Sequence, residues 1–304
     1  MISAEGITLA LAAWVVNRRR VTKPDRTPWW LWPNLLSLDA PLVAVVWLFM
    51  LARTWGVNYH PEHEYVLLAL VVWVVYVADR LLDVLVQGES PQCQERHRFH
   101  ARHRKGFVGV AVVAVGLVLF LALTKSPMAI FSYAAVAGFL AAGFFAMALF
   151  APPDAGEISY SKNVLGGITF AFGTSMVAHV YMFDKGIVDL LFSNREFISF
   201  AVLCVLNISA IDLWEHASRT DDEELKAQDE LALTLPLVLL GGAAFVFAWQ
   251  GEGSGAAPFF YAVLTGAALL FVLNRERNRF NLETLRVLAD VVMVAPLAVF
   301  LATR

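Results

Sequence analysis

Charged residues are scarce in this chain, and cysteines are nearly absent. Asp, Glu, Lys and Arg make up 16% of the 304 residues and hydrophobic residues 59%, which excludes an ordinary soluble domain of this length. The two cysteines, Cys93 and Cys204, provide neither a disulfide framework nor the spacing of a metal site. The net charge of −3 gives no indication of nucleic-acid binding, because the basic residues lie between apolar runs. The composition predicts a polytopic membrane protein.

The N-terminal segment, residues 1–34, lacks the features of a secretory signal. Its apolar run at residues 7–16 is followed, not preceded, by an arginine triplet, and no A-x-A-like cleavage site follows the run. The next stretch contains Trp29, Trp30 and Trp32 among basic residues and prolines, a composition typical of a membrane surface. We expect residues 1–34 to form a membrane-surface or anchoring segment, and residues 35–304 to form one transmembrane domain.

Nine apolar runs are long enough to cross a membrane as helices. The connections are short except around residues 87–106, 151–160 and 218–229, so no soluble domain fits between the runs. The sequence therefore predicts an all-α membrane protein with nine transmembrane helices. The runs cover about residues 36–57, 64–86, 107–124, 127–150, 160–183, 197–217, 230–249, 257–273 and 282–302.

The basic residues between the runs predict the orientation of the chain. If the segment before the first run is cytoplasmic, seventeen Lys and Arg residues lie on the cytoplasmic side and five on the other. Such an excess is typical of the cytoplasmic loops of membrane proteins. We expect an integral protein of the cell inner membrane, with the ends of the second and sixth runs on the cytoplasmic side.

Both of these runs end in a pair of acids. Asp79 and Asp83 are four residues apart, so on a helix both carboxylates leave the same face, and Asp212 and Glu215 are three residues apart. Ionisable groups this close to a membrane-length apolar segment are costly, and they usually face a polar cavity or a partner. The simpler alternative is that each acid lies in the headgroup region and pairs with a neighbouring basic side chain.

Carboxylates that face one another repel unless cations lie between them. Mg²⁺ takes oxygen ligands, usually one or two carboxylates together with waters and the phosphate oxygens of a substrate. The pattern therefore predicts Mg²⁺ as the cofactor, bound by the four acids, and a diphosphate as the ligand. The candidates for binding the diphosphate are Arg96, Arg98, Arg102, Tyr160, Lys162 and Asn207. The same arginines also fit an ordinary cytoplasmic loop that attracts anionic lipid headgroups.

A diphosphate held at the membrane surface above apolar helices implies that the rest of the substrate is a lipid tail. Aromatic residues are common in the runs, for example Trp47, Trp73, Tyr76 and Phe170. Their ring faces can stabilise an allylic carbocation after the diphosphate leaves, although packing within the membrane is their more usual role.

Four short motifs accompany the nine runs. They are Ser-Leu-Asp-Ala-Pro at residues 37–41, Asp79-x-x-x-Asp83, Tyr-Ser-Lys at residues 160–162, and Leu-Arg-Val-Leu-Ala-Asp at residues 285–290 with Pro296 after it. Together with the acid-ended second and sixth runs, these motifs resemble the UbiA superfamily of intramembrane prenyltransferases over roughly residues 35–304. The resemblance implies a helical bundle around a central cavity, Mg²⁺ at both acidic motifs, and cleavage of a polyprenyl diphosphate.

The leading hypothesis is an Mg²⁺-dependent enzyme that ionises a prenyl diphosphate and transfers the prenyl group to an acceptor. The chain has Val75 where the superfamily usually has Asn, and its second motif contains fewer Asp residues. These departures favour an alternative, a terpene cyclase of the same fold that needs no acceptor. A further alternative is a cation- or proton-coupled transporter, which usually places its ionisable groups closer to the middle of the membrane.

Overall fold

The structure is a computed structural model that describes residues 28–57, 61–87, 95–150, 160–182, 185–253 and 255–304. Side chains of residues 83–87, 95–98 and 150 lie outside this description. The chain divides into two compact units, Met1–Pro33 and Asn34–Arg304. Most of the first unit, and with it most of the predicted surface segment of residues 1–34, lies outside the described residues.

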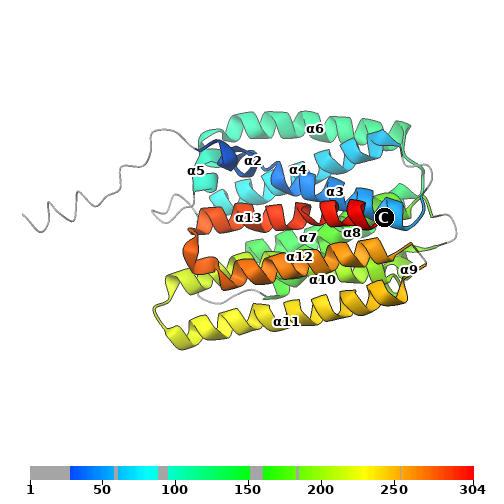
Figure 1. The fold of residues 1–304 in the computed structure, drawn as a ribbon. Helices are drawn as coiled ribbons and strands as arrows, with labels where there is room; N and C mark the ends of the chain where they lie inside the picture. The colour runs from blue at the N-terminus through cyan, green and yellow to red at the C-terminus, as the bar shows by residue number, and fades with distance from the viewer. Residues whose placement is uncertain (1–27, 58–60, 88–94, 151–159, 183–184, 254) are drawn as a thin grey trace, which may run out of the picture. The chain divides into compact units, whose positions relative to one another are not determined.

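Every described element is a helix, in agreement with the predicted all-α class. The elements are η1 (Trp29–Leu31), α2 (Trp32–Leu35), α3 (Asp39–Thr54), α4 (Glu62–Gln87), α5 (Glu95–Arg102), α6 (Arg104–Thr124), α7 (Ile130–Phe150), α8 (Tyr160–His179), α9 (Ile187–Phe192), α10 (Arg195–Arg219), α11 (Glu223–Gln250), α12 (Ala257–Arg275), η2 (Arg277–Arg279), α13 (Leu282–Val294) and α14 (Pro296–Thr303). In Figure 1, the long helices of the second unit lie side by side, with α5 at one end and α9 at the other.

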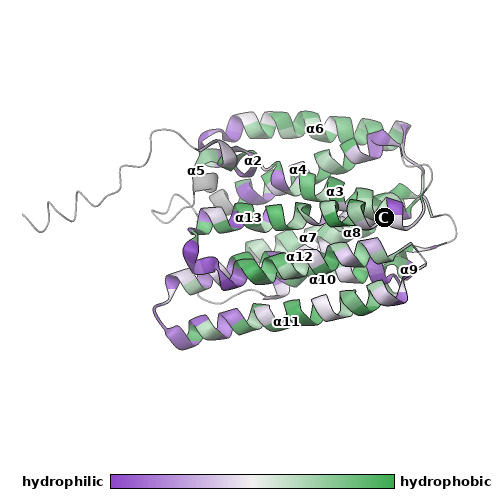
Figure 2. Cartoon of the chain, viewed as in Figure 1, coloured by the Kyte–Doolittle hydropathy of each residue, from purple (hydrophilic) through white to green (hydrophobic). Residues whose placement is uncertain are grey.

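Among the described residues, seven helical segments are long and apolar enough to cross a membrane. These segments lie in α4, α6, α7, α10, α11, α12 and the consecutive pair α13 and α14. The predicted count of nine is not confirmed, because α3 has only 16 residues and α8 is not among the seven. Figure 2 shows apolar residues along the helices and hydrophilic residues gathered at their ends, as expected for an integral membrane protein.

The C-terminal apolar run forms two helices instead of one. Pro296 begins α14, where its ring and missing N–H interrupt regular helical hydrogen bonding. Just before this break, the carbonyl of Met293 accepts a hydrogen bond of 2.8 Å from the indole nitrogen of Trp47. This bond joins α13 to α3, and Trp47 also stacks on Phe200 of α10 with ring centroids 4.4 Å apart. The aromatic core of the bundle therefore lies between α3, α10 and α13.

Helices α8 and α10 approach each other closely at Gly167. A Cβ atom added to Gly167 would lie 2.6 Å from the backbone nitrogen of Val205 and 2.5 Å from its Cγ2 atom. Because backbone atoms cannot move aside as a flexible side chain can, only glycine fits at this contact. Small residues permit this close approach of membrane helices.

We expect Gly167→Ala to destabilise the protein by about 3 kcal/mol, because the added methyl group forces α8 away from α10. The measurement is thermal unfolding in detergent. Gly173→Ala is the matched control on the same helix, since its added Cβ has no neighbour within 4 Å. A Gly167→Ala protein as stable as the Gly173→Ala control would contradict the described packing.

Candidate functional site

One phenol of the bundle lies within electrostatic range of acids from three helices. Tyr76 of α4 lies within electrostatic range of the carboxylates of Asp39, Asp79 and Asp290, which belong to α3, α4 and α13. Asp79 is one turn from Tyr76 on the same helix, so both side chains occupy the same side of α4. Cys204 of α10 is also within range of this phenol, which places α10 beside the same group.

The start of α3 is held in place by polar contacts to the end of α4. Asp39 accepts hydrogen bonds from the amide of Ala40 at 3.0 Å and from the side-chain nitrogen of Asn34 at 2.6 Å. The carbonyl of Asn34 in turn accepts a 3.1 Å bond from the buried guanidinium of Arg80. Ser37 adopts a positive φ of 56°, a conformation that few residues other than glycine take up, and so turns the chain into α3.

Glu215 of the second acidic pair is held by arginines. Glu215 of α10 accepts a hydrogen bond from the guanidinium of Arg286 of α13 and lies 3.4 Å from that of Arg219. Arg286 is almost fully buried, with 3% of its surface exposed, whereas Asp212 is half-buried. Asp290 follows Arg286 by one turn of α13, so the face that carries Arg286 also brings Asp290 towards Tyr76.

The two acidic pairs lie at the same end of the bundle. Both α4 and α10 run towards the end at which Arg80 meets the start of α3 and Glu215 meets the start of α13. If Cys204 lies at the same position along the bundle axis as Tyr76, the helical rise of about 1.5 Å per residue puts Asp212 about as far along that axis as Asp83. This arrangement is compatible with the expectation that the acidic ends of the second and sixth runs lie on the same side of the membrane, and the cytoplasmic placement of that side stays a prediction.

Asn207 of α10 is the described polar side chain that best fits a ligand position near the acids. It is buried, and its Oδ1 atom has no hydrogen-bond partner within the described residues. By the same helical rise, Asn207 lies at about the same position along the bundle axis as Asp79. A buried amide oxygen without a partner is costly, and a bound cation or a donor group would satisfy it.

The other predicted ligands of a diphosphate lie on α5 and α8. The Lys162 ammonium lies 5.3 Å from the ring centroid of Phe144, and Tyr160 is exposed at the start of α8. Arg102 is exposed at the end of α5. The side chains of Arg96, Arg98 and Asp83 lie outside the described residues, although α5 and α4 contain their backbones.

No group of three or more His, Cys, Asp or Glu side chains stands in a metal-ligating arrangement within the described part of the chain. This finding does not include Asp83, whose side chain is not described. Since Mg²⁺ usually takes only one or two carboxylates and completes its shell with water and phosphate oxygens, the Mg²⁺ expectation stays a prediction.

The sequence predicted no ligand-binding role for four residues at the acidic end of the bundle. Asp39 and Asp290 join Asp79 around Tyr76, while Arg80 and Arg286 bring buried positive charge. The signal was present in part, because Asp39, Arg286 and Asp290 stand in two of the short motifs described above. The spacing of Arg286 and Asp290, four residues apart in an apolar run, is the pattern that identifies one polar face of a helix.

A chain of aromatic contacts leads from the acids into the core. Tyr76 lies edge-on to Phe170 with centroids 6.4 Å apart, and Phe170 lies 6.4 Å from Phe200. Phe200 is fully buried and stacks on Trp47, whereas Tyr76 and Phe170 are half-buried. The first two rings are therefore candidates for contact with a substrate, and the deeper rings are packing residues.

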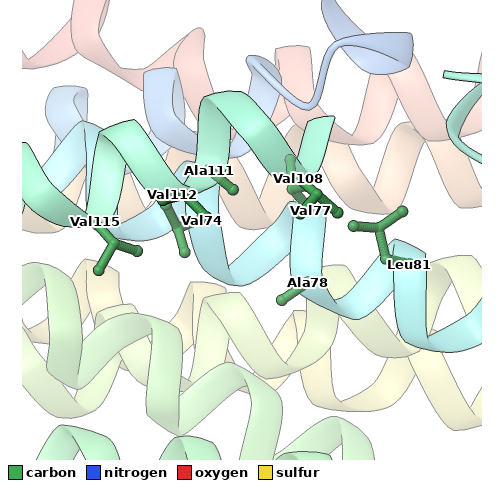
Figure 3. A pocket seen from close by; sticks show the side chains of 8 residues that line it. All are labelled: Val74, Val77, Ala78, Leu81, Val108, Ala111, Val112 and Val115. Carbon is green, nitrogen blue, oxygen red and sulfur yellow. The ribbon is translucent and has the colours of Figure 1, made fainter. Parts of the chain in front are cut away.

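A groove of about 270 Å³ lies on another side of α4, between α4 and α6 (Figure 3). Its lining consists of Val and Ala side chains and Leu81. The central cavity that the resemblance implies is not confirmed.

No family model matches the chain, and no curated protein or solved structure matches it.

Proposed function

We propose that this protein is an Mg²⁺-dependent intramembrane enzyme that ionises a polyprenyl diphosphate and transfers the prenyl group to an acceptor. The observation that carries the proposal is that Asp39, Asp79 and Asp290 lie within electrostatic range of Tyr76, at the end of the bundle where Arg286 pairs with Glu215. Each of these acids lies in a mostly apolar bundle of helices, where ionisable side chains usually serve a substrate or an ion. The resemblance to the UbiA superfamily agrees with this proposal.

The residues present suit a hard cation. Carboxylate and amide oxygens are the ligands that Mg²⁺ prefers, and Asn207 supplies a buried amide oxygen with no described partner. Asp79, Asp83, Asp212 and Glu215 would hold a pair of Mg²⁺ ions, with Asp39 and Asp290 adding negative charge around them. When bound, Mg²⁺ would offset the charge of the diphosphate as it leaves.

The protein side chains then divide the remaining work. Arg96, Arg98, Arg102 and Lys162 bind the diphosphate oxygens, and Tyr160 lies beside Lys162 at the start of α8. Cleavage of the carbon–oxygen bond leaves the electron pair on the diphosphate and an allylic cation on the prenyl chain. The acceptor attacks this cation and loses a proton. We also propose that α3 and α8 complete nine spans around the cavity in which this happens.

Tyr76 and Phe170 stand where the cation forms, since Tyr76 lies beside Asp79 and contacts Phe170. We expect Tyr76→Leu to lower kcat by about 30-fold, because a desolvated cation–π contact contributes roughly 2 kcal/mol. Tyr76→Phe, which keeps the ring, should retain most of the activity. Equal losses of kcat in the two variants, measured as prenyl product formed per enzyme, would contradict a role for the ring.

The terpene cyclase is the second candidate, and one experiment separates it from the transferase. Purified protein is incubated with Mg²⁺ and farnesyl or geranylgeranyl diphosphate, with and without a panel of aromatic acceptors, and the products are identified by mass spectrometry. The transferase predicts a prenylated acceptor that forms only when the acceptor is present. A cyclic hydrocarbon or alcohol formed without any acceptor would replace the transferase with the cyclase. No release of diphosphate under any condition would reject both.

A further inference from the structure

The groove between α4 and α6 lies on a different face of α4 from the acids. Val74, Val77, Ala78 and Leu81 line it from α4, whereas Asp79 shares a face with Tyr76. From α6 the lining is Val108, Ala111, Val112 and Val115, as Figure 3 shows. Every lining side chain is aliphatic, so the groove fits a hydrocarbon chain and offers no hydrogen bond from a side chain.

The groove is open to the surroundings of the bundle. Val112 is 67% exposed, and Val108 and Val115 are exposed as well. In the described residues, α6 packs mainly against α4 and α5, and little of its surface is buried in the bundle. In a membrane, this face of α6 therefore contacts lipid directly.

The length of the groove matches one leaflet. Val108 to Val115 spans seven residues, which corresponds to about 10 Å along the helix axis. Half of the hydrocarbon core is about 15 Å thick, so a groove that starts at the end of α6 stays within the nearer leaflet. Leu81, near the end of α4, and Val108, near the start of α6, place the groove at the proposed cytoplasmic side.

Positive charge stands at the membrane-surface end of the same groove. Arg104 precedes Val108 by four residues and Ala111 by seven, and Lys105 precedes Val108 by three and Val112 by seven. On a helix these spacings put both basic side chains on the groove face, one turn beyond its end. Both side chains are exposed. The face thus combines a cationic end with an apolar channel, which is the complement of an anionic amphiphile.

We propose that the α4–α6 groove binds an anionic glycerophospholipid of the cytoplasmic leaflet, with its phosphate headgroup at Arg104 and Lys105 and one acyl chain along Val108–Val115. A membrane phospholipid fits this outward, lipid-facing position, whereas the proposed prenyl diphosphate binds on the acidic face of α4. This binding does not depend on the proposed enzymatic function.

The test measures lipids bound to the full-length protein by native mass spectrometry, after titration with phosphatidylglycerol or phosphatidylcholine of identical chains. Wild-type protein should bind phosphatidylglycerol several-fold more tightly than phosphatidylcholine. Arg104→Gln with Lys105→Gln should remove this preference, since a basic residue near the surface changes the affinity by about fivefold. Ala111→Phe, which fills the groove, should weaken the binding of both lipids.

Two controls on α6 keep the test specific. Lys125→Gln removes a charge just beyond the other end of α6, and Val113→Phe enlarges a 72% exposed side chain on the opposite face, so both should bind lipid as the wild type does. Equal affinity of the wild type for the two lipids would overturn the proposal. The proposal would also be overturned if Lys125→Gln removed the preference for phosphatidylglycerol as fully as Arg104→Gln with Lys105→Gln does. Displacement of phosphatidylglycerol by geranylgeranyl diphosphate would assign the groove to the substrate instead.

Discussion

Asp79→Asn is expected to lower the Mg²⁺-dependent release of diphosphate from a prenyl diphosphate by about 10³-fold, which corresponds to roughly 4 kcal/mol in the activation free energy. The change keeps the size of the side chain and removes its negative charge. Asp79 is the one described acid of the proposed ligands that lies beside Tyr76, so its loss removes charge at the centre of the site. The measurement is diphosphate released per enzyme in saturating Mg²⁺.

Glu62→Gln is the matched control for this variant. Glu62 is an exposed carboxylate in the first turn of the same helix, α4, far from Asp79 along the axis. We expect this control to keep wild-type activity. Wild-type diphosphate release by the Asp79→Asn enzyme, at any Mg²⁺ concentration, would remove Asp79 from the proposed metal site.

Arg286→Gln is expected to destabilise the protein by about 3–5 kcal/mol and to abolish activity, because it removes the buried guanidinium partner of Glu215 and leaves only the exposed Arg219 beside it. Stability is measured by chemical or thermal unfolding in detergent, and activity by diphosphate release. Arg279→Gln is the control, since Arg279 is 76% exposed and its ion pair with Glu276 is a surface contact.

A double variant separates the two effects of Arg286. Glu215→Gln together with Arg286→Gln removes both charges, so we expect most of the lost stability to return. Activity should stay absent, because the double variant also lacks a proposed Mg²⁺ ligand. Recovery of activity along with stability would mean that the pair only supports the fold.

Much of the fold follows from the spacing of apolar residues. The runs near residues 64–86, 107–124 and 197–217 match α4, α6 and α10 closely, because a continuous apolar stretch of that length has few alternatives to a membrane helix. The limits appear where packing or a proline intervenes. Pro296 divides the last run into two helices, and the first run yields only the 16 residues of α3.

The site was predicted less completely, for a physical reason. Periodicity shows that Asp79 and Asp83 share a helix face, but it does not show which other helices meet that face. The approach of Asp39 and Asp290 depends on how α3 packs on α4 and how α13 packs on α3, which involves contacts such as Trp47 to Met293 across 246 residues. Likewise, nothing in the local sequence indicates that Arg286 reaches Glu215.

The central claim is that the acids of α4 and α10 bind one diphosphate through a shared pair of Mg²⁺ ions. The most direct measurement is Mn²⁺ binding, followed by electron paramagnetic resonance, in the presence of a non-hydrolysable prenyl diphosphate analogue. We expect wild-type protein to bind Mn²⁺ tightly only with the analogue, and Asp79→Asn and Asp212→Asn each to lose that binding. Wild-type Mn²⁺ affinity in either variant would contradict a shared site.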